Sequence, residues 1–301
     1  MKLISSTLPY QFTVPFLEIV LKIILEIVLM LVFVLATFSA QADNRIVSTD
    51  GFVTELIFSL EQQEQLIAID VTSTVPKGFK TLPNIGYHRN LSAEGLLNLH
   101  PSIVIGSEHM GPPSTVSALH SANIPLIQLN SAKTPEQLKN NVKIVASALK
   151  QQHKGEALNT TISKQISAIA GKGLHTERIA FLLSMDTSKL HLAGQGTNGD
   201  ALIKLLGASN VSNFKSYQNV SAESLLAMNP SIILVAGKNT DTAVSELLQA
   251  QRILKYSHAG QNNKILSING SSLVAGLSIS AITEALRISQ TLSPQHQGHS
   301  Q

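Results

Sequence analysis

The chain carries two copies of one segment: Asn90–Gly106 reads NLSAEGLLNLHPSIVIG, and Asn219–Val235 reads NVSAESLLAMNPSIILV. The copies lie 129 residues apart, and 9 of the 17 aligned positions are identical. Self-similarity at this distance indicates two copies of one structural unit rather than a short-period solenoid. The sequence therefore predicts two equivalent lobes with a cleft between them, and a partner that contacts both lobes.

Each copy begins with the pattern of a short helix. Ser92 and Ser221 are candidate N-caps, since each precedes Ala-Glu and a pair of leucines. Glu94 and Glu223 then fall in the first helical turn, where a carboxylate suits the positive end of the helix dipole. Stabilisation of the dipole is one interpretation of these matched acids, and contact with a partner is the other.

Each copy then continues into a strand. A proline, Pro101 or Pro230, follows each short helix, and helices usually end before a proline. The β-branched apolar runs after these prolines are typical of strands buried on both faces, as in a parallel sheet. Further short strands, such as Leu66–Ile69 and Leu126–Leu129, alternate with helical segments. The alternation predicts an α/β lobe with a largely parallel sheet.

The region between the two lobes has a helical pattern. From Pro135 to about Ile169 apolar residues recur at helical spacing, and the only glycine is Gly155. Thr134 is a suitable cap with Pro135 at the first helical position. This predicts one long bridging α-helix of roughly 50 Å, or a helix with a weak point near Gly155. The predicted organisation is a signal peptide at 1–42, an N-terminal lobe at 43–132, the bridging helix at 133–172, a C-terminal lobe at 173–293 and a disordered tail at 294–301.

The first 42 residues have the character of an export signal. Ile27–Ala36 is an unbroken apolar run, and Ala40-Gln41-Ala42 fits a signal-peptidase site, so we expect cleavage after Ala42. The acidic Glu18 and Glu26 are untypical of such a signal. An uncleaved membrane anchor and a true start at Met30 are the alternatives, although the apolar run is short for a span of about 20 residues.

The composition narrows the class of partner and the compartment. The net charge is +3 without a basic tract, which argues against nucleic acid as a partner. There is no cysteine, so the chain has no disulfide, no thiolate metal site and no lipid-modified N-terminal cysteine. An exported protein without a lipid anchor needs an outer membrane to retain it. These features indicate a Gram-negative periplasm.

Two α/β lobes, a bridging helix and an export signal resemble the periplasmic substrate-binding proteins of ABC importers for haem, siderophores and cobalamin. The resemblance covers almost all of the mature chain. Leu82–Gly95 looks like the cleft loop and docking helix of the haem-binding branch, as do Ser107-Glu108 with Gly111–Pro113 and Ala193-Gly194 with Gly196-Thr197. The resemblance implies a monomer that delivers haem to an inner-membrane permease, with Glu94 and Glu223 docking onto arginines of that permease.

The resemblance also implies the ligand of the haem iron. In the haem-binding branch the tyrosine of this loop ligates the iron, and here that residue is Tyr87. Ferric iron is bound by an anionic phenolate where haem is held rather than turned over. Arg89 has the reach to favour the ionised phenol and to contact a propionate. Without the resemblance, Tyr87 reads as an ordinary loop tyrosine.

Histidines are the second group of candidate haem contacts. His88 replaces a residue that is usually apolar in the branch, and it either stacks on the porphyrin or faces solvent. His109 follows a strand at the edge where ligands of α/β sheets gather, and His191 precedes the glycine turn of the second lobe. We expect His100, His120 and His153 at the surface and His296 and His299 in the tail. The segment Asn269–Leu273 departs from the branch, which has more Gly and Phe there.

Other functions have weaker signals. Gly194, Gly196 and Gly199 almost form a dinucleotide-binding pattern, but no acidic residue follows at the required distance. A zinc or manganese site is another alternative, with ligands from His88, His109 and His191 and from Asp186 or Glu108. The spacing of these residues does not require such a site. The same scaffold with a ferric siderophore or cobalamin is the main alternative. The sequence contains no GxSxG, Walker A or HExxH motif, so we expect no enzymatic activity.

Overall fold

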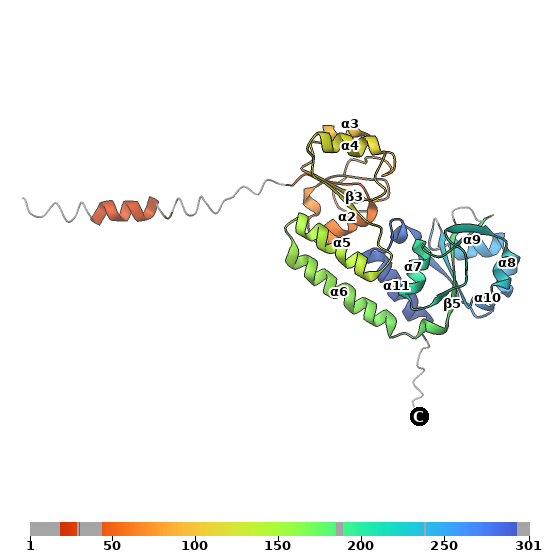
Figure 1. Cartoon of the computed structure of the whole chain (residues 1–301). Helices are drawn as coiled ribbons and strands as arrows, with labels where there is room; N and C mark the ends of the chain where they lie inside the picture. The colour runs from red at the N-terminus through yellow and green to blue at the C-terminus, as the bar shows by residue number, and fades with distance from the viewer. Residues whose placement is uncertain (1–18, 29, 31–43, 185–188, 238, 294–301) are drawn as a thin grey trace, which may run out of the picture. The chain divides into compact units, whose positions relative to one another are not determined.

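The computed structural model describes residues 19–28, 30, 44–184, 189–237 and 239–293 (Figure 1). The chain divides into two compact units, Met1–Asp43 and Asn44–Gln301. In the first unit residues 19–28 are helical. None of the described helices is both long and apolar enough to span a bilayer. The expected cleavage site after Ala42 and the expected tail at 294–301 lie outside the described residues.

The first lobe is built on a parallel sheet of four strands in the order β2-β1-β3-β4. The strands are β1 (Ile46–Ser48), β2 (Leu66–Ile69), β3 (Ile103–Ser107) and β4 (Leu126–Leu129), and the helices are α2 (Gly51–Ser59), α3 (Ala93–Asn98) and α4 (Pro113–Ser121), with a 3-10 turn at η1 (Gln63–Gln65). The first three strands each lead into a helix or loop that carries the chain back to the end of the sheet where the next strand begins, as parallel pairing requires. The predicted strands and their parallel arrangement are confirmed.

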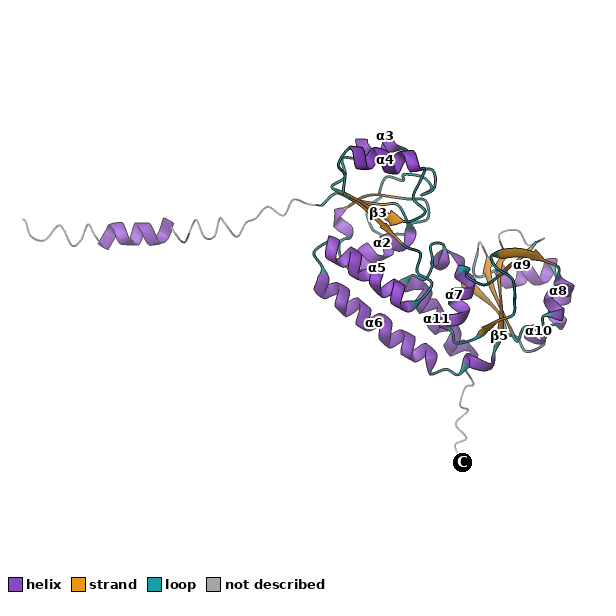
Figure 2. Cartoon of the chain, in the orientation of Figure 1, coloured by secondary structure: helices purple, strands orange, loops and turns teal. Residues whose placement is uncertain are grey.

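The second lobe repeats this plan with an antiparallel addition. Its sheet, drawn in orange in Figure 2, has the order β10-β9-β5-β6-β8, and β7 pairs with β5. The strands β10, β9, β5 and β7 are parallel, whereas β6 is antiparallel to β5 and β8. The elements are β5 (Arg178–Ser184), β6 (Leu190–Ala193), α7 (Asn198–Leu205), β7 (Ser209–Asn210), β8 (Tyr217–Val220), α8 (Ala222–Ala227), β9 (Ile232–Gly237), α9 (Ala243–Ala250), η3 (Arg252–Tyr256), α10 (His258–Gln261) and β10 (Ile265–Asn269), with η2 (Leu174–Thr176) before β5.

The connection between the lobes corrects one prediction. The chain forms two helices, α5 (Pro135–Ala148) and α6 (Gln152–Ala170), rather than one helix of roughly 50 Å. The helix ends because Lys150 adopts a left-handed conformation, with φ of 55°. Thr134 caps α5 through a capping box with Gln137, as its sequence position predicts. The bridging role therefore falls to α6, which is about 28 Å long.

Gly155 marks a close approach between these two helices rather than a break. A Cβ atom on Gly155 would lie 2.5 Å from the Cβ of Ala146 on α5. The missing side chain lets α6 pack directly on α5, and the two helices lie side by side in Figure 1. The weak point in the predicted helix therefore lies at Lys150, and Gly155 serves the packing of the hairpin.

The two lobes share one hydrophobic core. The largest cluster of buried apolar residues includes Ile46 and Phe52 from the first lobe, Ile162 from α6 and Phe181 from the second lobe. The last helix, α11 (Ile279–Leu292), contacts α2, α6 and α7 and contributes four buried apolar residues to this cluster, Ala281, Ile282, Ala285 and Ile288. The lobes are therefore joined by packing as well as by the chain.

A backbone contact adds to this packing. The N–H of Leu277, just before α11, donates a hydrogen bond of 2.7 Å to the carbonyl of Ala132, just after β4. Gly276 lies beside Ala132 with φ of 102°, a conformation that only glycine adopts without strain. This crossing ties the end of the first lobe's sheet to the start of the last helix.

Candidate functional site

A cavity of about 730 Å³ opens between the two lobes. Its first-lobe wall comes from the segment after β2 and from Tyr87, and its second-lobe wall from β5, α7, β8, β9 and the η4 turn (Gly270–Leu273). The lining residues are Val71, Thr72, Ser73, Thr74, Tyr87, Phe181, Leu183, Asn198, Tyr217, Ala236, Gly237, Gly270, Ser271, Leu273 and Val274. Ligands of open α/β sheets bind outside the carboxyl ends of the strands, and the cavity lies there.

Part of the second-lobe wall is one face of a sheet. Phe181 and Leu183 alternate along β5, so they point to the same side. The register places Leu183 beside Ala236 of β9. The ring of Tyr217, at the start of β8 opposite Ala193, completes this face. This sheet face is therefore largely apolar.

The first-lobe wall is an ordered loop that presents Tyr87. The loop pairs with β2 through hydrogen bonds from the N–H of Ile85 to the carbonyl of Ile69 at 3.0 Å and from the N–H of Val71 to the carbonyl of Gly86 at 2.9 Å. Gly86 has φ of 86°, which permits the turn before Tyr87. Tyr87 is 46% exposed and lines the cavity. Its phenol is therefore accessible to a ligand in the cleft.

His88 lies behind Tyr87 and is not one of the cavity-lining residues. It is 2% exposed, and its ring centroid is 4.2 Å from that of Tyr87. Its Nδ1 lies 3.4 Å from Oδ2 of Asp70. The same Oδ2 accepts a hydrogen bond from the hydroxyl of Thr72, and Oδ1 accepts one from Ser73, at 2.7 Å each. The sequence places His88 on the porphyrin or in solvent, whereas the structure gives it a buried supporting position.

Two carboxyl groups near His88 have opposite pKa shifts. Burial raises the pKa of Asp70, but hydrogen bonds from His88, Thr72 and Ser73 outweigh that effect and hold the pKa below its ordinary value. Burial dominates at Asp50, the N-cap of α2, and raises its pKa. One oxygen of Asp50 accepts from the N–H of Phe52, and the other is buried without a hydrogen-bond partner. The cluster therefore favours charge at Asp70 and disfavours it at Asp50.

Arg89 and His109 lie close to this cluster on the first lobe. Burial lowers the pKa of His109, and the positive charge of the exposed Arg89 lowers it further. The Nε2 of His109 lies 3.1 Å from Oγ of Ser131, whose N–H donates to Glu108 at 2.9 Å. The structure thus brings Arg89 and His109 near Tyr87, although neither lines the cavity.

His191 belongs to the second lobe. It lies on β6 opposite Leu183 of β5, so both side chains point to the same face of the sheet. Leu183 lines the cavity and His191 is half-buried beside it. In the described part of the chain no three His, Asp or Glu residues are grouped as a metal site. Asp186, the other acid considered for such a site, lies outside the described residues.

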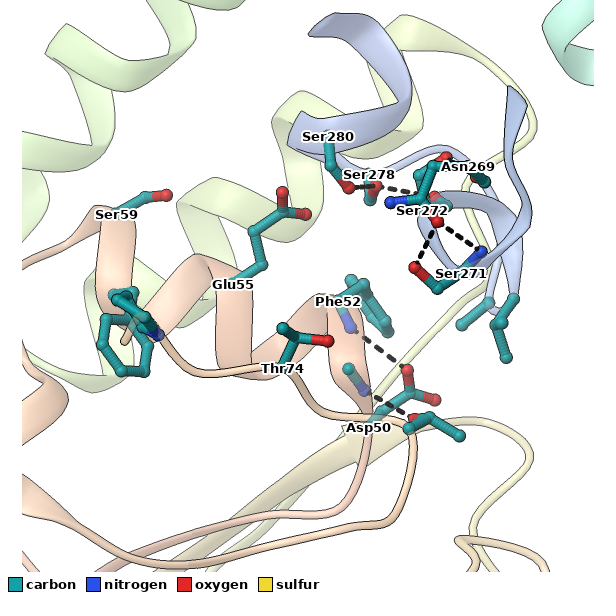
Figure 3. A pocket seen from close by; sticks show the side chains of 16 residues that line it. Asp50, Phe52, Glu55, Ser59, Thr74, Asn269, Ser271, Ser272, Ser278 and Ser280 are labelled. Carbon is teal, nitrogen blue, oxygen red and sulfur yellow. Dashed lines mark hydrogen bonds between the residues drawn. The ribbon is translucent and has the colours of Figure 1, made fainter. Parts of the chain in front are cut away.

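A smaller polar chamber of about 330 Å³ adjoins the cleft (Figure 3). It shares Thr72, Thr74, Ser271 and Val274 with the cleft lining. The carboxylate of Glu55 on α2 points toward Ser278 and Ser280 at the start of α11. Burial raises the pKa of Glu55, and hydrogen bonds from Ser280 and Ser278 oppose this shift. The sequence offered no signal for this chamber, because its walls come from residues 50–76 and 269–280, which are far apart in the chain.

Glu94 and Glu223 occupy matching positions on the two lobes. Each is exposed and lies in the first turn of its helix, α3 or α8. Ser92 and Ser221 cap these helices, as the sequence predicts, by accepting hydrogen bonds of 3.1 Å from Gly95 and Ser224. Hydrogen bonds from its own N–H and from Ser221 lower the pKa of Glu223. The expected surface positions of His100, His120 and His153 are confirmed.

The glycines of the near-dinucleotide pattern have structural roles. A Cβ atom on Gly199 would lie 2.6 Å from the ring of Phe181, and one on Gly194 would lie 2.3 Å from the carbonyl of Ser216. These glycines allow α7 and the preceding turn to pack closely on the sheet. The strand before them, β6, is antiparallel to its neighbours, unlike the parallel strand of a dinucleotide-binding unit.

Comparisons with known proteins identify a single class. Residues 46–271 match the model of a family described as periplasmic binding protein. The periplasmic haem-binding protein HutB of Vibrio cholerae has 37% sequence identity to this chain and a TM-score of 0.77, with 84% of this chain and 100% of that chain covered. A periplasmic haem-binding protein from Pseudomonas aeruginosa has 28% identity and a TM-score of 0.74, covering 84% of this chain and 93% of the other.

A curated relative carries a different ligand in its name. The vitamin B12-binding protein of Pectobacterium carotovorum is 23% identical over 208 residues, which are 68% of this chain and 75% of that protein. The haem-binding and B12-binding proteins therefore share the fold and the class with this chain.

Proposed function

Because the chain belongs to the periplasmic binding protein family, we propose that it captures haem in the cleft between its lobes and delivers it to an ABC permease of the inner membrane. Haem is the cargo, and no covalent chemistry is required. The proposal describes a monomer, since one chain supplies both walls of the cleft.

The observation that carries this proposal is the position of Tyr87. Tyr87 lines the first-lobe wall of a cavity whose other wall includes a largely apolar sheet face. A porphyrin needs apolar contact on its faces and a ligand for its iron, and the cleft offers both. The 37% identity to a haem-binding protein supports the same ligand.

Tyr87 is the proposed axial ligand of ferric iron. A phenolate is a hard anionic ligand, and the protein tunes such iron through the axial group and its surroundings. Arg89 is two residues away and exposed, so its guanidinium is free to pair with a haem propionate. His88 supports Tyr87 from behind, and His109 and His191 remain candidates for further contact with haem.

A titration with ferric haem tests this proposal. The wild-type protein should bind haem saturably and give a high-spin tyrosinate absorption spectrum. Tyr87→Phe should lose that spectrum and keep the fold, because it removes only the hydroxyl. Tyr256→Phe is a matched control, since Tyr256 is 75% exposed and lies on η3 away from the cavity. An unchanged spectrum in Tyr87→Phe would redirect the search to His88, His109 and His191.

Cobalamin is the second candidate ligand, because a curated relative is a vitamin B12-binding protein. A parallel titration with cyanocobalamin separates the two. Saturable binding of cyanocobalamin without binding of haem would replace the haem proposal. A ferric siderophore is less well served, since anionic complexes need cations and the described residues lining the cavity include no Lys or Arg.

The permease is the proposed partner of Glu94 and Glu223. The two carboxylates are exposed on equivalent helices of the two lobes, so two cations on the permease would fix the orientation of the docked protein. The double variant Glu94→Ala/Glu223→Ala should bind haem normally and fail in transport. Glu156→Ala, an exposed acid on α6, is the control and should transport at the wild-type rate. Transport by the double variant at the wild-type rate would remove the docking role.

Export completes the proposal. A signal peptide at residues 1–42, cleaved after Ala42, would place the mature protein in the periplasm. The mass of the protein recovered from a periplasmic fraction tests this directly. A mature chain that begins at Asp43 supports the proposal, and a full-length chain retained in the membrane would favour the anchor.

A further inference from the structure

We infer that Tyr217 is the porphyrin-packing residue of the second lobe and that it holds the macrocycle without ligating the iron. This inference rests on the proposed haem-binding function and deepens it. It divides the two tyrosines of the cleft between two tasks, ligation by Tyr87 and packing by Tyr217.

The first step is that both tyrosines face one cavity from opposite lobes. Tyr87 comes from the loop after β2, and Tyr217 from the start of β8. Both line the same space of about 730 Å³. A flat ligand that contacts Tyr87 on one side therefore has Tyr217 within the wall on its other side.

The second step is that Tyr217 is the aromatic group available on that wall. Phe181 also lines the cavity, but it is 1% exposed and lies within the shared core. Tyr217 is half-buried, so part of its ring remains free to contact a ligand. Aromatic rings pack well against flat conjugated ligands, and offset stacking adds to the apolar contact.

The third step concerns the phenolic oxygen of Tyr217, which is already engaged within the protein. The N–H of Gly199, in the first turn of α7, donates to this oxygen at 3.3 Å. Burial raises the pKa of Tyr217, and the hydrogen bonds from Gly199 and Thr197 oppose this shift without reversing it. Ligation of ferric iron by tyrosine needs a phenolate. The position of Tyr217 therefore favours a protonated, anchored ring over a second iron ligand.

The contrast with Tyr87 supports the division of tasks. Tyr87 is 46% exposed, and none of the side-chain hydrogen bonds that the structure gives for the described residues involves its hydroxyl. Arg89 lies near Tyr87 in the chain, whereas the hydroxyl of Tyr217 lies beside the backbone N–H of Gly199 and the side chain of Thr197. The accessible hydroxyl of Tyr87 is open to the iron of a bound haem, whereas the anchored ring of Tyr217 provides a packing surface.

The test compares ferric haem with metal-free protoporphyrin IX, which has the same macrocycle and no iron. Both ligands are titrated into the wild-type protein and into Tyr217→Ala, Tyr217→Phe and Tyr87→Phe. Tyr217→Ala should weaken both ligands by about 10- to 100-fold, because it removes the aromatic contact but leaves the iron ligand. Tyr217→Phe should bind both ligands within about threefold of wild type and keep the tyrosinate spectrum of the haem complex. Tyr87→Phe should weaken haem far more than protoporphyrin IX.

Two controls keep the result interpretable. Tyr256→Ala removes an exposed tyrosine of the same lobe outside the cavity and should bind both ligands as wild type does. Tyr217→Leu keeps an apolar side chain against the core, so it serves if Tyr217→Ala does not fold, and it should show the same loss on a smaller scale.

The outcomes distinguish failure of the proposed haem binding from failure of the packing role of Tyr217. If the wild-type protein binds neither haem nor protoporphyrin IX, the proposed function and this inference both fail. If it binds haem through Tyr87 but Tyr217→Ala and Tyr217→Leu retain wild-type affinity for both ligands, only the packing role of Tyr217 fails. A change in the iron spectrum of Tyr217→Phe would show ligation by Tyr217 and overturn the division of tasks.

Discussion

Gly276→Ala should loosen the junction between the two lobes. Gly276 has φ of 102°, and a Cβ atom there would lie 2.5 Å from the carbonyl oxygen and 2.8 Å from the nitrogen of Ala132. The neighbouring Leu277 donates a hydrogen bond of 2.7 Å to that same carbonyl. The substitution therefore adds backbone strain, a contact shorter than real Cβ atoms make, and pressure on a hydrogen bond that joins the lobes.

The magnitude follows from these three contributions. A left-handed backbone conformation costs an L-residue about 1–2 kcal/mol. Relief of the short contact requires Ala132 to move, and losing one hydrogen bond costs about 1 kcal/mol net. We expect a total of about 3 kcal/mol, and at 2–4 °C per kcal/mol for a chain of this size the melting temperature should fall by about 6–12 °C.

Gly78→Ala is the matched control. Gly78 has φ of 87°, but a Cβ atom on it would have no neighbour within 4 Å. Gly78→Ala therefore introduces the backbone strain without the clash. Part of the resulting loss of stability is offset because alanine makes the unfolded chain stiffer, and the net loss in the free energy of unfolding should be about 1 kcal/mol or less. Thermal unfolding followed by circular dichroism compares the two variants. Equal melting temperatures for Gly276→Ala and Gly78→Ala would refute the reasoning, because the contact with Ala132 would then have no energetic weight.

Three further predictions concern residues that lie behind the walls of the cleft or of the adjoining chamber. Asp70→Asn should lower the melting temperature at pH 7. Because the pKa of Asp70 is lowered on folding, the ionised carboxylate stabilises the wild-type protein at neutral pH. The difference in melting temperature between wild type and variant should vanish as the pH falls below 3.8, the ordinary pKa of the carboxyl group. Asp50→Asn should leave the melting temperature at pH 7 unchanged or raise it. The pKa of Asp50 is raised on folding, so the wild-type protein loses stability as the pH rises through the pKa of Asp50 in the folded state. A clearly lower melting temperature of the variant at pH 7 would contradict this. Gly199→Val should weaken haem binding at least tenfold in a titration, because its side chain would collide with Phe181 in the cavity wall, and wild-type affinity would show that the wall adapts.

The local pattern of the sequence was sufficient for the strands and for the repeated unit. The bounds of β2 and β4, Leu66–Ile69 and Leu126–Leu129, agree with those expected from the apolar runs. The caps Ser92 and Ser221 also follow from short-range spacing. These features depend on residues close together in the chain, so periodicity and capping chemistry identify them.

The helical hairpin was not predictable in the same way. Apolar spacing continues through α5 and α6, since both helices bury one face in the same core. The chain reverses at Lys150, which takes a left-handed conformation without being a glycine or an asparagine. No residue type near Lys150 signals this turn in the sequence. The turn is stabilised instead by contacts between the two helices, such as the close approach of Gly155 to Ala146.

The candidate site was predictable in part. The loop that carries Tyr87 could be placed at a cleft by resemblance, and the structure puts Tyr87 on the cavity wall. The pairing of His88 with Asp70 was not foreseen, because the two residues are 18 positions apart and meet only through the pairing of the loop with β2. Tyr217 was also missed, since its place on the wall depends on the antiparallel register of β6 and β8.

The last helix has a consequence for how the protein is made. The 14 residues of α11 lie against α2, which is among the first elements of the lobed unit to leave the ribosome, and against α6. Without α11 the core that both lobes share would present apolar side chains to water. The side of the first lobe that packs against α11 is therefore covered only once the last helix has been made. The core that the two lobes share is thus completed only after both sheets have been synthesised.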